Sequence, residues 1–193
     1  MLIRIKTSSV NKIKTSSVNK KAIQRRRCAM LGRAIVTMVI ALAGIPTVAQ
    51  GQEVRQERNI SLPLAVEAAN AALQACTEKG YSVSVSVVDR AGQLKVLVRS
   101  DGAGPHTIDA SRRKAYTSAS TKNPTSAILE NVQKNPGAAY LPMIDGFLIL
   151  GGGIPLRAGD EVIGAIGVSG APGGHLDDQC AQAGIDKIRD RLK

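Results

Sequence analysis

Residues 81–99 have the pattern of a β-hairpin, and this limits the chain to folds that contain antiparallel strands. Over residues 81–88, valines at every second position alternate with serines, as in a strand that buries one face. Residues 89–92 have the composition of a tight turn, and residues 94–99 follow as the second strand. A strand–turn–strand unit of this length joins antiparallel neighbours, because parallel strands need a longer crossover.

The rest of the chain from residue 61 onward alternates between helical and strand patterns. Apolar spacing predicts helices over residues 61–76, from residue 107 to about residue 121, over residues 125–133 and over residues 176–192. Short apolar runs predict further strands over residues 147–150, 154–157 and 162–169. The resulting order, α-β-β-α-α-β-β-β-α, predicts an α+β fold in which helices pack on a mainly antiparallel sheet of five strands.

The positive charge is concentrated at one end of the chain. The 193 residues include 26 Lys and Arg against 15 Asp and Glu, and ten of these basic residues, with none of the acidic ones, lie in residues 1–49. The remaining 144 residues therefore carry 16 basic and 15 acidic side chains, which is nearly neutral. Nucleic-acid binding needs a basic surface on the folded part, often with stacking aromatics. The chain has only three Tyr, one Phe and no Trp, so nucleic-acid binding is disfavoured.

The basic segment has the layout of an export signal. An octamer, IKTSSVNK, occurs twice over residues 5–20, and its polar composition predicts disorder. Three arginines at residues 25–27 precede an apolar stretch at residues 34–48, and small residues follow. This order predicts a signal peptide cleaved after about Ala49, and hence a periplasmic or secreted protein without stable membrane anchoring; an uncleaved anchor is the alternative. Residues 50–60 are then a linker, and residues 61–193 form the domain.

Several motifs resemble the GlcG/HbpS family, which is also similar to the C-terminal domain of PduO-type proteins. They are VVDRAG at residues 87–92, DGAGPHT at 101–107, SRRKAYT at 111–117, GGGIP at 151–155, VIGAIGVSG at 162–170 and CAQAG at 180–184. The resemblance implies a profilin-like α-β-α sandwich, a homo-oligomer, and haem or corrinoid binding as found in some members.

The first candidate site is the glycine-rich loop at residues 102–105 and the helix that follows it. A loop that leads into a helix start presents free backbone N–H groups, which suit an anion. The candidate ligand-binding residues are His106, Thr107, Arg112, Arg113 and Tyr116. They suit a carboxylate, such as a haem propionate or a small organic acid, with His106 as an axial iron ligand or proton donor. Alternatively, the glycines form a tight turn, Asp109 caps the helix and the arginines form surface ion pairs.

The second candidate site is another glycine-rich segment, residues 170–174, which leads into the last helix. His175 with Asp177 or Asp178 could bind a metal weakly, but the usual zinc-ligand spacing is missing. The alternative is that these residues cap the helix, where acidic side chains in the first turn are favourable.

Two cysteines remain after signal cleavage, Cys76 and Cys180. In the fold that the resemblance implies, the first and last helices can lie side by side, and an exported protein can form disulfides. We therefore expect a Cys76–Cys180 disulfide; the alternative is two buried free thiols.

The motifs favour a binding protein over a catalyst, since the chain has no nucleophile elbow, catalytic-triad order or phosphate-loop spacing. The function expected is an exported haem-binding homo-oligomer, with a role in haem sensing or iron handling. One alternative is an enzyme or accessory protein acting on a small organic acid such as glycolate. Another is a structural oligomer without a ligand.

Overall fold

The computed structural model describes residues 54–193, so the predicted repeat and signal peptide lie outside the described residues. Within this part, Arg55–Lys193 form one compact unit. Its helices are α2 (Leu62–Thr77), α3 (His106–Thr121), α4 (Thr125–Lys134) and α5 (Gly174–Ile188), and its strands are β1 (Ser84–Asp89), β2 (Leu94–Arg99), β3 (Gly153–Ala158) and β4 (Glu161–Ser169). Three short 3-10 turns, Pro136–Ala138, Leu141–Met143 and Arg189–Arg191, complete the set.

The four strands form one antiparallel sheet in the order β2-β1-β4-β3. The predicted hairpin is present, with Val87 opposite Val96 and the turn completed by Gly92 at a positive φ of 78°. The α+β class and the antiparallel sheet are confirmed, but the expected fifth strand is wrong. Residues 147–150 join no strand: the Leu148 N–H donates to the Thr117 hydroxyl on α3 instead of to a neighbouring strand.

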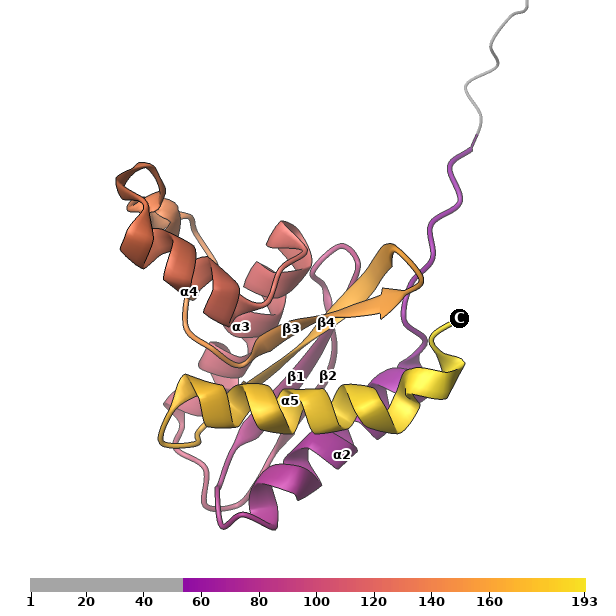
Figure 1. The fold of residues 1–193 in the computed structure, drawn as a ribbon. Helices are drawn as coiled ribbons and strands as arrows, with labels where there is room; N and C mark the ends of the chain where they lie inside the picture. The colour runs from indigo at the N-terminus through magenta and orange to yellow at the C-terminus, as the bar shows by residue number, and fades with distance from the viewer. Residues whose placement is uncertain (1–53) are drawn as a thin grey trace, which may run out of the picture. The chain divides into compact units, whose positions relative to one another are not determined.

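The helices cover both faces of the sheet, which gives three layers. α2 and α5 pack side by side on one face, and α3 lies on the other (Figure 1). Small residues allow this close packing. A Cβ added at Gly184 of α5 would lie 3.0 Å from the Cβ of Ala72 on α2, and one added at Gly167 of β4 would lie 3.0 Å from the Cβ of Ala115 on α3.

Strand β1 is buried on both faces, although its valine–serine alternation predicted a half-buried strand. Val85 and Val87 join the main core between the sheet and helices α2 and α5, while Val88 packs with Ala115 and Ala119 of α3. Its serines face α3 and are fully buried there. Each serine is paired: the Ser84 and Thr107 hydroxyl oxygens lie 2.7 Å apart, and those of Ser86 and Ser111 lie 2.8 Å apart. A polar strand face can therefore be an interior face when the covering helix supplies hydroxyls at matching positions.

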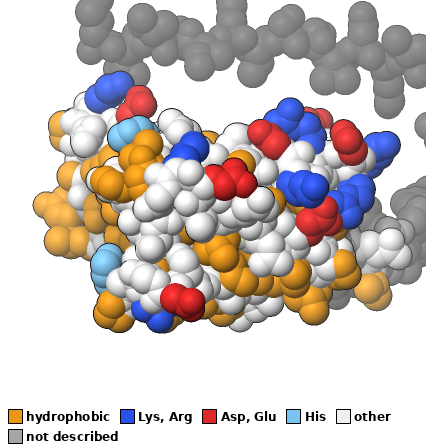
Figure 2. Space-filling view, turned by 90° about the horizontal axis from the view of Figure 1, so that it is seen from below, with side chains coloured by type: hydrophobic (Ala, Val, Ile, Leu, Met, Phe, Trp, Pro, Cys, Tyr) orange, Lys and Arg blue, Asp and Glu red, His pale blue; other side chains and the backbone are white. Residues whose placement is uncertain are grey.

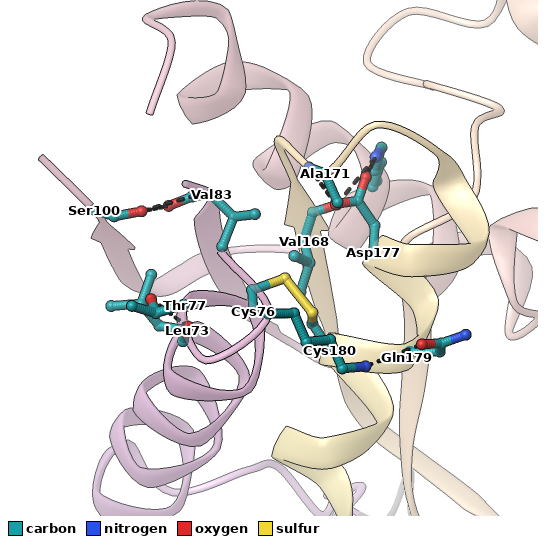
Figure 3. The surroundings of a disulfide bond; sticks show 12 residues. Leu73, Cys76, Thr77, Val83, Ser100, Val168, Ala171, Asp177, Gln179 and Cys180 are labelled. Atoms are coloured by element: carbon teal, nitrogen blue, oxygen red, sulfur yellow. Dashed lines mark hydrogen bonds and ion pairs between the residues drawn. A yellow bond between two sulfur atoms is a disulfide. The ribbon is translucent and has the colours of Figure 1, made fainter. Parts of the chain in front are cut away.

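Helices α2 and α5 are joined covalently. Cys76 near the end of α2 forms a disulfide with Cys180 in α5; the two Cα atoms are 5.5 Å apart and the residues are 104 positions apart in sequence (Figure 3). Both cysteines are fully buried. Separately, none of the helices in residues 54–193 has the length and apolar character needed to cross a membrane.

The Cys76–Cys180 bond closes a long loop, so its removal should destabilise the protein. We expect the Cys76→Ala/Cys180→Ala variant to lose about 2–5 kcal/mol of unfolding free energy, because the unfolded chain regains the entropy that the bond removes. Urea unfolding of the oxidised protein, the dithiothreitol-reduced protein and the variant would measure this. Equal midpoints for all three, or two titratable thiols in the unreduced protein, would contradict the prediction.

Candidate functional site

A cavity of about 280 Å³ lies where α3 and α5 both begin. His106, the first residue of α3, forms part of its wall, and residues 169–174 form the opposite part. Lys114 and Asp177 line it as well, together with the apolar residues Ala110 and Leu150. The cavity therefore joins His106, from the first candidate site, to the glycine-rich segment of the second candidate site.

The helical repeat explains which α3 residues reach the cavity. His106, Ala110 and Lys114 are spaced by four residues and so share one face of the helix. His106 is exposed, and its ring turns back over the preceding loop. A Cβ added at Gly104 would lie only 2.8 Å from the Cε1 atom of the ring, so glycine at this position makes room for the imidazole.

The cavity contains a buried ion pair that the sequence analysis missed. The Lys114 Nζ donates to Asp177 Oδ2 at 2.8 Å and to the Val168 carbonyl at 3.0 Å. The two side chains are only 1% and 4% exposed. The sequence did hold a signal: Lys114 lies two turns after His106, and Asp177 lies three residues before the buried Cys180, hence on the inward face of α5.

Two aspartates near the start of α5 hydrogen-bond to three other segments of the chain. Besides binding Lys114, Asp177 accepts a hydrogen bond from the Ala171 N–H at 3.1 Å (Figure 3). Asp178 accepts one from the Gly152 N–H at 2.6 Å. Asp177 lies in the first turn of α5 and Asp178 directly after it, but no side chain caps the start of this helix; each aspartate instead hydrogen-bonds a different segment of the chain.

Burial raises the pKa of the Asp177 carboxyl above its ordinary value, because desolvation disfavours the charged form. The Lys114 ammonium and the Ala171 N–H oppose this effect, while the nearby Asp178 adds to it. Asp177 is therefore a carboxylate whose charge the surrounding protein only partly compensates.

The other predicted site residues of α3 do not surround the cavity with His106. The buried Thr107 donates to the Gly104 carbonyl and pairs with Ser84, while Arg112 forms a surface ion pair with Asp109 at 2.7 Å. Arg113 donates to the Phe147 carbonyl. Tyr116 packs edge-on against the Phe147 ring, with ring centres 6.2 Å apart. None of these four side chains lines the cavity.

His175 is exposed in the first turn of α5, and it does not belong to the cavity wall. No group of three or more potential metal ligands (His, Cys, Asp or Glu) is present within residues 54–193. Among the described residues, the weak metal site considered for His175 with Asp177 or Asp178 thus finds no third ligand.

The fold and the cavity together define a small three-layer α+β protein with a ligand-sized cavity at the adjoining starts of two helices. Residues 60–186 match the family described as "Haem degrading protein HbpS-like", and the chain belongs to this family.

Solved structures and curated relatives agree with this assignment. A double mutant of HbpS from Streptomyces reticuli is 42% identical, with a TM-score of 0.66 over 75% of this chain and 97% of that one. A complex of PduOC with haem is 26% identical, with a TM-score of 0.61 over 67% of this chain and 95% of that one. Protein GlcG of Escherichia coli K12 is 34% identical over 92 residues, which is 48% of this chain and 67% of GlcG.

Removing one member of the buried ion pair should lower the stability of the folded protein. We expect Asp177→Asn to lower the unfolding free energy by about 3–5 kcal/mol, because it leaves the buried Lys114 ammonium without its counter-charge. The double variant Lys114→Met/Asp177→Leu should be close to the wild type or more stable, because an apolar pair of similar volume avoids the desolvation cost.

Asp178→Asn is the matched control for this experiment. It removes the neighbouring charge but keeps an oxygen that can accept from the Gly152 N–H, so it should cost no more than about 1 kcal/mol. Chemical unfolding of all three variants provides the comparison. Equal losses for Asp177→Asn and Asp178→Asn would show that the ion pair has no special role in stability.

Proposed function

We propose that this protein is an exported haem-binding protein in which His106 provides the iron ligand at the mouth of the cavity. The observation that carries the proposal is the position of His106: an exposed imidazole on the wall of a cavity, in a chain of the HbpS-like family. Neutral imidazole is a common haem ligand. The similar structure of PduOC in complex with haem supports the same ligand class.

The residues around the cavity fit part of a porphyrin. A volume of about 280 Å³ is just below the range for small-molecule pockets, roughly 300–1,000 Å³, so the cavity would enclose only an edge of the ring. The apolar residues Ala110, Leu150, Ala171 and Pro172 line it, and Leu150 is 46% exposed. Figure 2 shows hydrophobic side chains beside the histidines at one end of the visible face, while charged side chains are densest at the other end.

Different residues of the protein would then have different roles in haem binding. His106 holds the iron, the apolar wall excludes water from one edge of the ring, and the Lys114–Asp177 pair supplies a polar end to the cavity. Bound haem would supply the redox and gas-ligand chemistry on which haem sensing or iron handling depends.

Haem is favoured over the other ligands considered from the sequence. The haem-bound relative and the family description both concern haem, and neither concerns a corrinoid. An enzyme or accessory protein acting on a small organic acid is less favoured for the same reason. A structural oligomer without a ligand leaves the exposed histidine at the cavity mouth unexplained.

The proposal includes export and self-association. Residues 1–49 provide the signal layout, and the Cys76–Cys180 disulfide suits an oxidising compartment. Exposed apolar side chains between α4 and β3, notably Tyr140, Met143 and Ile144, offer surface for contact between copies.

The role of His106 can be tested with hemin. We expect a Soret band when hemin is titrated into the protein, and we expect His106→Ala to shift this band and weaken binding by about tenfold or more, because an axial ligand is lost. His175→Ala is the matched control, since it removes the other exposed histidine outside the cavity wall. An unchanged spectrum and affinity in His106→Ala would exclude His106 as the ligand.

Export can be tested by fractionating cells that produce the full chain. We expect the mature protein in the periplasm or medium, with its first residue close to Gln50, and N-terminal sequencing would identify that residue. Size-exclusion chromatography with light scattering of the same sample would give the number of subunits. A full-length product retained in the cytoplasm would refute export, and a monomer at high concentration would refute self-association.

A further inference from the structure

The Lys114 ammonium lines the cavity and has a hydrogen-bond donor to spare. An ammonium group carries three N–H donors. Among residues 54–193, the Val168 carbonyl and Asp177 Oδ2 accept two of them, at 3.0 and 2.8 Å. The side chain is only 1% exposed, so bulk water hardly reaches the third N–H donor. Its hydrogen-bond partner therefore depends on which molecule enters the cavity.

The hydrogen bonds of the neighbouring aspartates do not include the third Lys114 donor. Asp177 Oδ1 accepts from Ala171, Asp177 Oδ2 from Lys114, and Asp178 Oδ1 from Gly152. A guest in the cavity that Lys114 lines can supply an acceptor for that donor. An anionic oxygen is the strongest acceptor for such a buried cation.

We propose that the cavity binds a carboxylate group, with Lys114 as its hydrogen-bonding counter-ion, and that Asp177 takes up a proton as the carboxylate binds. This inference rests on the proposed haem function, because a haem propionate is a carboxylate at the edge of the ring. A free carboxylate offers the same chemistry to Lys114.

The charge balance of the cluster requires the proton. Before binding, Lys114 and Asp177 carry opposite charges that cancel. A guest carboxylate adds one negative charge, and two carboxylates that share one buried cation do not both stay ionised. One proton from solvent goes to Asp177, whose pKa is already raised by burial, and the Lys114 ammonium and the guest carboxylate keep their charges. The cluster thus returns to neutrality.

The other titratable groups near Asp177 affect the same equilibrium. Asp178 on α5 acts in the same direction, because its negative charge favours protonation of Asp177. His106 is the titratable side chain that lines the same cavity from the start of α3. β4 contributes only the Val168 carbonyl to the ion pair. Carboxylate binding should therefore weaken as the pH rises above the pKa of Asp177.

The first test uses sodium propionate and isothermal titration calorimetry in two buffers of different ionisation enthalpy. We expect the wild type to take up protons on binding, with affinity falling as pH rises, and Asp177→Asn to bind without proton uptake. Lys114→Met/Asp177→Leu, which keeps the fold by the argument above, should bind about tenfold more weakly or worse. Lys187→Met removes an exposed lysine of α5 and is the matched charge control; its affinity should equal that of the wild type.

The second test identifies the source of the carboxylate by comparing hemin with hemin dimethyl ester, in which both propionates are blocked. A wild-type preference for hemin of about tenfold, absent in Lys114→Met/Asp177→Leu, supports a haem propionate as the guest. Equal binding of hemin and its ester, with propionate binding that still requires Lys114, supports a free carboxylate.

The outcomes separate this inference from the haem proposal. If no porphyrin binds, the haem function fails, and propionate binding that requires Lys114 still supports the carboxylate site. Hemin can bind through His106 while propionate affinity and the preference for hemin over its ester stay unchanged in Lys114→Met/Asp177→Leu. In that case the haem function holds and the carboxylate site is overturned. Propionate binding without proton uptake overturns the role of Asp177.

Discussion

The ion pair between Lys114 and Asp177 is the interaction on which the arrangement of the site depends. It connects α3, which carries His106, to the first turn of α5, which lies on the other side of the cavity. Through the Val168 carbonyl the same lysine also bonds to β4. Two charges that are almost fully removed from water are costly, and apolar side chains could fill the same space at less cost. The pair therefore makes more physical sense as a polar element of a binding cavity than as a source of stability.

The sequence predicted most of the fold because the relevant signals are local. The hairpin at residues 81–99 needs only a period of two and a turn, and the strand over residues 94–99 agrees with β2 as observed. The prediction of a fifth strand failed because residues 147–150 have the apolar composition of a strand but do not pair with either edge strand, β2 or β3. Their backbone bonds instead to Thr117, a side chain that lies 31 residues away in sequence. Composition does not reveal such a long-range partner.

The site was less predictable than the fold, for a related reason. His106 and the glycine-rich segment at residues 170–174 stood out by residue type, but their convergence on one cavity depends on where α3 and α5 begin in the fold. Of the α3 residues, His106, Ala110 and Lys114 line the cavity, whereas Arg112, Arg113 and Tyr116, which the sequence had grouped with His106 by proximity along the chain, do not. A four-residue spacing from His106 leads to Ala110 and Lys114, so this spacing would have drawn attention to the lysine. It would not have excluded Arg113, which lies seven residues after His106 and is directed away by its hydrogen bond to the Phe147 carbonyl.

The disulfide depends on an oxidising environment, and it holds the part of α5 that lines the cavity. Cys180 lies one helical turn after Asp177, and its bond to Cys76 fixes that turn of α5 against α2 (Figure 3). The same turn holds Lys114, Ala171 and Gly152. A disulfide of this kind persists where the environment is oxidising. The proposed export and the proposed ligand site would then be physically connected, because the disulfide that an oxidising compartment permits supports the helix turn at the polar end of the cavity.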